Sequence, residues 1–196
     1  YNNSSNWQGI KFENASDESL LRFVRISGAA HMDFLDMAGG GLTLIYSNPT
    51  LEHVLINNNY GLMGSGALFF ASSPILKNIT IVDNLSEISC AISILAYYPD
   101  RPQIFNNLTI ANNLIGNAFG GEPQGAAGIC LNQTSPYIVN SIIASNYPGQ
   151  VFLDQSQGEA DAIIRYSNIE GGWQGDSNID INPLFMSPDN GNYTLQ

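Results

Sequence analysis

Charged side chains are scarce in this sequence, and most of those present are acidic. Only 12% of the 196 residues are charged, against about 25% in ordinary soluble domains. Six Lys and Arg stand against 17 Asp and Glu, which leaves a formal net charge of -11. Nucleic-acid binding needs a basic surface, so no nucleic-acid partner is expected. A polyanionic polysaccharide is disfavoured unless cations bridge the two, whereas neutral glycans and divalent cations are compatible partners.

Long apolar runs are missing as well. No run approaches the ~20 residues that a membrane-spanning helix needs, so no membrane insertion is expected. The hydrophobic content of 44% is nevertheless too high for a disordered tail. Because Tyr1 is not an initiator methionine, we expect a processed product or a fragment whose targeting signal is gone.

What the sequence does contain is a repeated register. In four copies, a small residue stands eight positions before a proline, and an asparagine follows the next apolar stretch. The copies are Gly41, Pro49 and Asn59; Gly66, Pro74 and Asn84; Ala91, Pro99 and Asn113; and Gly128, Pro136 and Asn146. The first three copies are 25 residues apart. A fixed period of this length predicts a solenoid in which each copy forms one coil.

Within residues 66–84, apolar side chains alternate as they do in short strands. Corners are predicted at residues 72–74, at Asn78 and at residues 83–84, where asparagine tolerates the left-handed conformation. The predicted inward pairs are Leu42/Leu44, Ala67/Phe69, Ile92/Ile94 and Ile129/Leu131 before the proline, and Val54/Ile56, Ile79/Ile81, Leu108/Ile110 and Ser141/Ile143 after it. Like residues would stack from coil to coil about 4.8 Å apart, with the asparagines hydrogen-bonding along their column.

These features predict an all-β fold: a single-stranded right-handed parallel β-helix solenoid. It would have three short strands per coil, about six to seven coils, and one domain over residues 1–196. A β-sandwich would need hairpin turns of the Asn-Gly or Asp-Gly kind, which are almost absent between the strands. The Leu-x-x-Leu-x-Leu pattern of a leucine-rich repeat is also absent.

Two insertions interrupt the repeat, one at residues 100–102 and a longer one at about residues 114–125. Insertions in solenoids form loops on one face, which is often the binding face, although a tolerated surface loop is the simpler interpretation. The two cysteines, Cys90 and Cys130, are too few for a disulfide framework. They occupy different positions in neighbouring coils, so two separate thiols are expected rather than a bridge.

Segments at both ends of the chain carry a family resemblance. They are residues 7–12 (WQGIKF) with 21–26 (LRFVRI), residues 171–175 (GGWQG) with 178–185 (NIDINPLF), and residues 189–193 (DNGNY). Together with the repeat, they resemble pectin-lyase-like, right-handed parallel β-helix repeat proteins of the secreted and cell-surface kind. The resemblance covers nearly the whole chain and implies the β-helix fold. It implies no single activity, because the family includes lyases, hydrolases, adhesins and non-catalytic surface domains.

The basic groups do not form the pattern that the resemblance associates with polysaccharide lyases. Those enzymes use carboxylates that hold calcium together with a Lys, Arg or His base. Here Lys11 and Lys77 are isolated, and neither lies in an acidic run. Arg22 and Arg25 fall in the first coil, where a solvated face is the expected location.

Glycoside hydrolases on this fold resemble one another in Asn-Thr-Asp, Asp-Asp and Gly-His-Gly motifs, none of which occurs in this sequence. His31 and His53 are each alone, and His53 is expected to form hydrogen bonds at a corner that asparagine occupies in other coils. A carboxylate pair for acid–base chemistry would have to come from Asp33 and Asp36, or from Asp154, Glu159 and Asp161. Their spacing selects no pair.

Two kinds of ligand site are left open. Asp176, Asn178 and Asp180 place oxygen ligands at alternate positions, which suits calcium, although a polar turn before Pro183 explains the same residues. Calcium is the only cofactor that the sequence suggests. Sugar rings are predicted to stack on a strip of aromatic residues near one corner, unless some of these rings pack inward. The predicted strip consists of Tyr46, Phe70, Tyr97 and Tyr98.

Asparagine acceptor motifs for glycosylation are also frequent, in part because corner asparagines and outward threonines fit the coil independently. The predicted acceptors are Asn14, Asn78, Asn84, Asn107, Asn132 and Asn192. Their number favours an extracellular or cell-surface protein.

The leading functional prediction is a non-catalytic extracellular β-helix domain with a structural or adhesive role. An intact repeat without a recognisable active-site pattern motivates it. The alternatives are a carbohydrate-binding module and a divergent polysaccharide lyase. Because no capping helix is predicted, the unpaired strands at the two ends favour either missing flanking sequence or end-to-end stacking of copies into a fibre.

Overall fold

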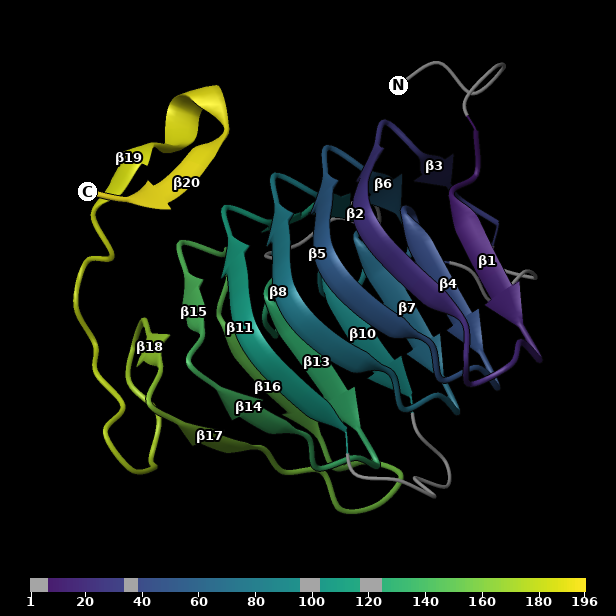
Figure 1. Ribbon diagram of the computed structural model, residues 1–196. Coiled ribbons are helices and arrows are strands. Elements are labelled where there is room, and N and C mark those ends of the chain that lie inside the picture. Colours follow the sequence, from purple (N-terminus) through teal and green to yellow (C-terminus); the bar gives the residue numbers. More distant parts are fainter. Residues whose placement is uncertain (1–6, 34–38, 96–102, 117–124) are drawn as a thin grey trace.

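The computed structural model describes residues 7–33, 39–95, 103–116 and 125–196. Short parallel strands stack along one axis and form three sheets (Figure 1). Sheet A contains β1 (Ile10–Glu13), β4 (Leu42–Ile45), β7 (Ala67–Phe70), β10 (Ile92–Leu95), β13 (Ile129–Asn132) and β16 (Val151–Asp154), in that order. The order follows the chain, so each coil contributes one strand and pairs with the coils before and after it.

Sheets B and C complete each coil. Sheet B contains β2 (Leu20–Ser27), β5 (Thr50–Asn57), β8 (Ile75–Val82), β11 (Ile104–Ala111), β14 (Tyr137–Val139) with β15 (Ile142–Ala144), and β17 (Ile163–Arg165) with β18 (Asn168–Ile169). Sheet C contains the two-residue strands β3 (Ala30–His31), β6 (Tyr60–Gly61), β9 (Leu85–Ser86) and β12 (Leu114–Ile115). The chain is therefore an all-β parallel solenoid, as predicted.

The core is built from the inward columns that the sequence predicted. All sixteen residues of the eight predicted inward pairs are at most 2% exposed. The small residues of the repeat are explained by close backbone approach. A Cβ atom on Gly41 would lie 2.7 Å from the carbonyl oxygen of Gly66 and 2.9 Å from Nδ2 of Asn59. A larger side chain there would push the ladder of asparagines away from the strand.

The asparagine column forms a continuous buried ladder. Nδ2 of Asn59 donates to Oδ1 of Asn84 (3.0 Å), and the same bond joins Asn84 to Asn113 (3.0 Å). The bond from Asn113 to Asn146 is 2.8 Å long. The ladder was predicted from the sequence. The left-handed conformation was predicted at the ladder asparagine itself, which is one position too late. Positive φ angles fall on the preceding residues, Asn58, Asp83, Asn112 and Ser145.

The partition of the coil into strands also differs from the prediction. Residues on either side of Asn78 were expected to form two separate strands. Instead β8 runs through this position and bends sharply, with φ of 55° at Asn78. The same left-handed bend occurs at Phe23, His53 and Asn107 in β2, β5 and β11, the other eight-residue strands of sheet B. Hydrogen bonding to neighbouring coils therefore continues on both sides of the bend.

The solenoid has about five turns, fewer than the six to seven predicted. An insertion lengthens the coil between β10 and β13, and residues 182–196 leave the solenoid. The latter form an antiparallel hairpin of β19 (Phe185–Ser187) and β20 (Asn192–Leu195), joined by the short turn η1 (Pro188–Asn190). Figure 1 shows this hairpin, in yellow, to one side of the coils.

The C-terminal end of the core is covered, which corrects the expectation that the register stops without a cap. Trp173 packs against the core cluster, and its indole N–H donates to the carbonyl of Ala162 (3.4 Å). Ile179 forms a parallel bridge with Asn168 of the last coil. This cover is an irregular segment with one aromatic side chain packed on the core, and it lacks the amphipathic pattern by which a capping helix is recognised in a sequence. Across the described residues, no helix is long and apolar enough to cross a membrane.

Candidate functional site

The outer face of sheet A carries a column of residues in one register. Ile45, Phe70, Leu95, Asn132 and Asp154 are neighbours from strand to strand. The column changes from apolar to polar along the solenoid axis. A ligand lying across these strands would meet hydrocarbon at one end and an amide and a carboxylate at the other.

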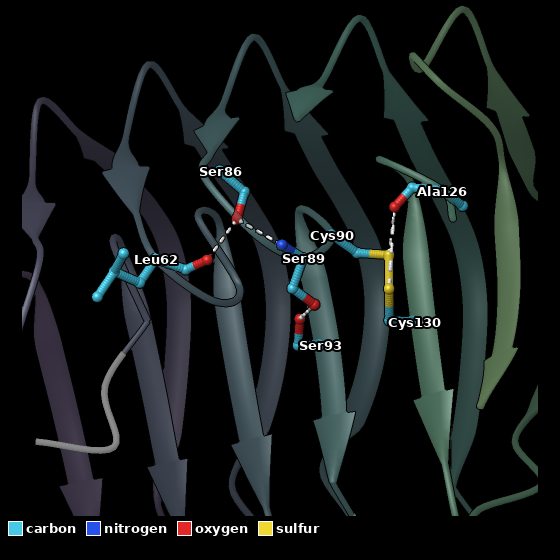
Figure 2. The surroundings of a disulfide bond; sticks show 7 residues. All are labelled: Leu62, Ser86, Ser89, Cys90, Ser93, Ala126 and Cys130. Carbon is cyan, nitrogen blue, oxygen red and sulfur yellow. Dashed lines mark hydrogen bonds between the residues drawn. A yellow bond between two sulfur atoms is a disulfide. The ribbon is translucent and has the colours of Figure 1, made fainter. Parts of the chain in front are cut away.

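Turns that precede sheet A fold back over part of this outer face. The Ser89 and Ser93 hydroxyls lie 2.7 Å apart, and Oγ of Ser86 donates to the carbonyl of Leu62 (2.9 Å). Figure 2 shows these bonds fastening the turn that ends at Cys90. Ser93 is only 1% exposed although it faces away from the core. The turns therefore cover part of the outer face of sheet A and border the part that stays open.

The same fold-back produces a disulfide bond between Cys90 and Cys130, so the prediction of two separate thiols is wrong (Figure 2). Cys130 pairs in register with Ser93, and the turn carries Cys90 back toward that position. The two Cα atoms are 5.5 Å apart, within the usual range for a disulfide. The prediction of separate thiols assumed that only residues in equal register meet, and the folded-back turn breaks that assumption.

Beside the disulfide lies a pocket of about 400 Å³, which we call the sheet A pocket. Leu95, Ile115 and Ala126 contribute apolar surface to its lining. Phe152, which is 41% exposed, also lines the pocket. Asn132 and Asp154 form its polar corner, where Nδ2 of Asn132 donates to Oδ2 of Asp154 (2.7 Å). An apolar pocket with a few oriented polar groups is the usual form of a small-molecule site.

The carboxylate of Asp154 is held in its ionised form. Hydrogen bonds from the hydroxyl and the backbone N–H of Ser156, and then from Asn132, lower the pKa of Asp154 below its usual value. The backbone bond from Ser156 is 2.9 Å long. At neutral pH this group therefore accepts hydrogen bonds and does not supply a proton.

Only part of the predicted aromatic strip lies in the described residues. The rings of Tyr46 and Phe70 meet edge to face with centroids 5.6 Å apart, and Tyr46 is 58% exposed. Phe70 belongs to the outer column that leads to the sheet A pocket. Tyr97 and Tyr98 lie outside the described residues. Sugar stacking by the strip stays a prediction.

The predicted calcium ligands are engaged separately. Oδ1 of Asn178 accepts from the N–H of Ser167 (3.1 Å), and its Nδ2 donates to the carbonyl of Ile164 (2.8 Å). Asp176 forms an ion pair with Arg165 (3.4 Å). Asp180 is exposed. Within residues 7–33, 39–95, 103–116 and 125–196, no group of three or more His, Cys, Asp or Glu side chains is placed to hold a metal ion.

The basic groups weighed for lyase chemistry form surface pairs on the structure. Arg22 and Lys77 both bind Glu52, at 2.6 and 3.4 Å. Lys11 pairs with Glu13 at 3.2 Å. Nε of Arg25 donates to the side-chain oxygen of Asn57 (3.0 Å). These pairs fit the solvated face that was expected for Arg22 and Arg25.

The two histidines lie in different sheets, His53 in β5 of sheet B and His31 in β3 of sheet C. The ring of His53 stacks on Phe23 with centroids 4.9 Å apart, and its Nε2 lies 3.4 Å from Nδ2 of Asn78. It thus occupies the corner column that asparagine fills in the following coils, as predicted. His31 is buried in β3 of sheet C.

The carboxylates that were candidates for acid–base chemistry are not brought together as a pair among the described residues. Asp36 lies outside the described residues, so its relation to Asp33 has no structural account. Glu159 and Asp161 are exposed, and Oδ1 of Asp161 accepts from the N–H of Ala162 (2.7 Å). Among these acids, Asp154 lines the sheet A pocket.

The predicted glycosylation acceptors divide into exposed and buried groups. Asn14, Asn78, Asn107 and Asn192 are exposed. Asn84 is 1% exposed within the ladder, and Asn132 is 7% exposed beside Asp154. The buried ladder leaves no room for a glycan on Asn84. Nδ2 of Asn132 is hydrogen-bonded to Asp154 in the lining of the sheet A pocket, and glycosylation of Asn132 stays a prediction. The acceptor motif alone does not reveal burial.

Phe152 and the polar corner were not predicted from the sequence as members of a binding site. Two signals pointed to this region. Insertions in solenoids often lie on the binding face, although a tolerated surface loop was the simpler interpretation of this one. Its ends at Ile115 and Gly125 line the sheet A pocket; residues 117–124 lie outside the described residues. The outward column of sheet A could also have been read from the register of the repeats.

Comparison with known proteins places the fold in a family. A family model described as a right-handed β-helix region matches residues 1–169. No curated protein and no solved structure gives a significant match. The matched segment includes all three parallel sheets and ends at Ile169 of β18. On this match and on its stacked parallel coils, the chain belongs to the family of right-handed parallel β-helix proteins.

Proposed function

We propose that this chain is a non-catalytic, extracellular β-helix domain that binds neutral glycans on the outer face of sheet A and so serves adhesion. The sheet A pocket is the observation that carries this proposal. Its apolar wall and the exposed ring of Phe152 suit the apolar face of a sugar ring. Asn132 and the ionised Asp154 supply a donor and acceptors for hydroxyl groups.

Charge supports a neutral ligand. The chain has a net charge of -11, and Asp154 adds a fixed negative charge to the polar corner of the pocket. A polyanionic chain would be repelled there. A neutral glycan has hydroxyl donors for the carboxylate and meets no like charge.

The disulfide supports the extracellular location. Such bonds persist in oxidising compartments and are rare in the cytosol. The Cys90–Cys130 bond joins neighbouring coils, and Cys90 is fully buried. Exposed acceptor motifs at Asn14 and Asn107 are consistent with the same location.

The ionised state of the Asp154 carboxylate favours binding of a glycan without its hydrolysis. A glycosidase needs one carboxylic acid whose pKa is raised so that it can protonate the leaving group. The pKa of Asp154 is instead lowered by its hydrogen bonds. A divergent polysaccharide lyase is the alternative, and the appearance of unsaturated sugar products would identify it.

End-to-end assembly is a separate proposal that concerns the same domain. Ile10 and Phe12 in the first coil are only partly buried, and their strand, β1, forms one edge of sheet A. An edge strand offers unpaired backbone groups to another chain. Electron microscopy of the protein would show filaments if copies stack, and discrete particles if they do not.

The glycan proposal is tested by a neutral-glycan array, followed by calorimetry on the best ligand with and without calcium. Phe152→Ala removes the exposed ring and is expected to weaken binding roughly tenfold, since a ring contact contributes about 1.5 kcal/mol. Phe23→Ala is the matched control, because Phe23 is an exposed phenylalanine on sheet B. It is expected to leave the affinity unchanged.

Equal loss in both phenylalanine variants would contradict the assigned surface. Degradation of any glycan that stops when a particular acidic or basic residue is replaced would overturn the non-catalytic assignment. Tyr97→Ala and Tyr98→Ala test the remainder of the aromatic strip in the same assay.

A further inference from the structure

A second pocket lies at the C-terminal end of the solenoid and shares no lining residue with the sheet A pocket. Its volume is about 620 Å³, and we call it the end pocket. It is bounded by the turn over residues 145–151, between β15 and β16, and by residues 169–173 after β18. Within the described residues, sheet C ends at β12, and Tyr147 adds only an isolated bridge to Leu114. The hollow forms where another strand of sheet C would continue the column.

Two aromatic side chains line the end pocket. Tyr147 is 56% exposed although it belongs to a turn fixed by backbone bonds to Asn113 and Ile115 (both 3.0 Å). Trp173 is partly buried against the core, and its indole N–H is directed to Ala162. An exposed ring on a hydrogen-bonded backbone and a half-buried ring line the same hollow, which lowers the ordering cost of an aromatic contact with a ligand.

A carboxylate is held at the same place by the end of the asparagine ladder. Nδ2 of Asn146, the last ladder residue, donates to Oε1 of Gln150 (2.7 Å). Nε2 of Gln150 in turn donates to Oε2 of Glu170 (3.1 Å). The N–H of Ser145 donates to the same carboxylate oxygen (2.5 Å).

The other carboxylate oxygen remains available to a ligand. Both bonds use Oε2 of Glu170, and no described residue binds its Oε1. Glu170 is exposed, and none of the described residues that line the pocket is Lys, Arg or His. The pocket therefore presents one oriented negative charge beside two aromatic rings.

This combination selects for positive charge. Aromatic faces attract ammonium groups, and a nearby carboxylate strengthens that attraction. The net charge of -11 raises the local concentration of cations around the whole chain. A hard metal ion would require several oxygen ligands. The side-chain oxygens of Asn146 and Gln150 in this lining already accept hydrogen bonds from Asn113 and Asn146, and Glu170 is the one carboxylate in the lining.

We propose that the end pocket binds a small organic cation, with an alkylated or primary ammonium group placed between Tyr147, Trp173 and the free oxygen of Glu170. The ligand is independent of the glycan proposed for sheet A. Quaternary ammonium and a lysine side chain share this chemistry, and the experiment separates them.

The test uses Trp173 as its own reporter. The chain has two tryptophans, so Trp7→Phe leaves Trp173 as the only indole fluorophore. This background is titrated with choline, with its uncharged isostere 3,3-dimethyl-1-butanol, and with Nα-acetyl-lysine amide. We expect a saturable fluorescence change with choline or the lysine compound and none with the isostere. The tighter of the two cations identifies the source of the ammonium group.

Three variants assign the site. Glu170→Gln keeps the hydrogen-bond acceptor but removes the charge, and is expected to weaken cation binding at least about tenfold. Tyr147→Ala is expected to weaken it to a similar extent, while Tyr147→Phe retains affinity because the ring remains. Phe152→Ala in the sheet A pocket should change nothing, which separates this proposal from the glycan proposal.

Equal responses to choline and its isostere would overturn the proposal, because the pocket would then recognise shape without charge. No response to any cation, or binding of neutral sugars in place of cations, would also overturn it. Should Glu170→Gln disturb the fold by weakening the Ser145 contact, the comparison of Tyr147→Ala with Tyr147→Phe still decides the question. The urea midpoint of each variant shows which of them remain folded.

Discussion

Asn84 joins three successive coils through one buried side chain. Its Oδ1 accepts from both the backbone N–H and Nδ2 of Asn59, at 3.0 Å each. Its Nδ2 donates to the carbonyls of Ile56 and Val82. The sequence could predict this ladder because the asparagines recur in register, and stacked coils bring equal positions together.

We expect Asn84→Ala to lower the free energy of unfolding by about 3 kcal/mol, because two buried donors of Asn59 lose their acceptor. Urea denaturation followed by circular dichroism measures the loss. Asn106→Ala is the control: Asn106 is exposed, and its side chain accepts one bond from Asn140 (3.1 Å). If Asn106→Ala lowered the free energy of unfolding by more than about 1 kcal/mol, the effect of Asn84→Ala could not be attributed to the buried ladder.

The residue with a positive φ angle at each corner could not be identified from the sequence alone. From the sequence, this left-handed conformation was predicted at the ladder asparagine, since asparagine adopts it readily. The structure assigns it to the residue before, which is Asn58, Asp83, Asn112 or Ser145. Both positions are polar in the repeat. Only the path of the backbone shows which of them turns the corner and which points inward.

At the scale of elements, the C-terminal hairpin β19–β20 is attached to the solenoid through Tyr193. Its hydroxyl donates to Oδ1 of Asp83 (2.6 Å), which belongs to a corner more than a hundred residues earlier in the chain. The ring also meets Phe185 edge to face at 5.2 Å. Burial, followed by the bond to Asp83, raises the pKa of Tyr193 well above its usual value.

We expect Tyr193→Phe to loosen the hairpin without unfolding the coils. A hydrogen bond to a charged group contributes about 1.5 kcal/mol, so amide exchange over residues 185–195 should become roughly tenfold faster at neutral pH. Hydrogen–deuterium exchange measured by mass spectrometry checks this. Tyr166→Phe is the control, because Tyr166 is 60% exposed. Unchanged exchange in the Tyr193 variant would contradict the attachment.

The same side chain predicts a pH dependence. Because the pKa of Tyr193 is raised in the folded state, its stabilising contact is fully present below the unfolded pKa of about 10 and is lost as pH rises through the folded value. Ultraviolet absorbance of tyrosinate should show a late-titrating tyrosine that is missing in Tyr193→Phe. Titration of all tyrosines together in the parent protein would argue against it.

At the scale of the whole molecule, the disulfide fastens one coil to the next. It closes a loop with a sequence separation of 40 residues between Cys90 and Cys130. In the chain-entropy account, closing a loop of this size stabilises the folded protein by about 4 kcal/mol, and typical measured values are about 2–4 kcal/mol.

We therefore expect the double variant Cys90→Ala, Cys130→Ala to unfold at a lower urea concentration, with a loss of about 2–4 kcal/mol. Reductant should lower the midpoint of the parent protein toward that of the variant. It should leave the variant unchanged, which serves as the internal control. A parent protein that is insensitive to reductant even after prolonged unfolding would show that the bond does not form.

The sequence by itself determined the stacked parallel coils, the inward columns and the asparagine ladder. Each of these depends on residues in equal register, and a fixed repeat brings equal positions together. The tertiary structure decided what the register does not describe: the turn that carries Cys90 to Cys130, the pocket beside Phe152, and the cover formed by Trp173. These three features share one physical cause. Each depends on contacts between residues at different positions of the repeat, and the way a turn or the C-terminal tail folds back on the coils determines those contacts.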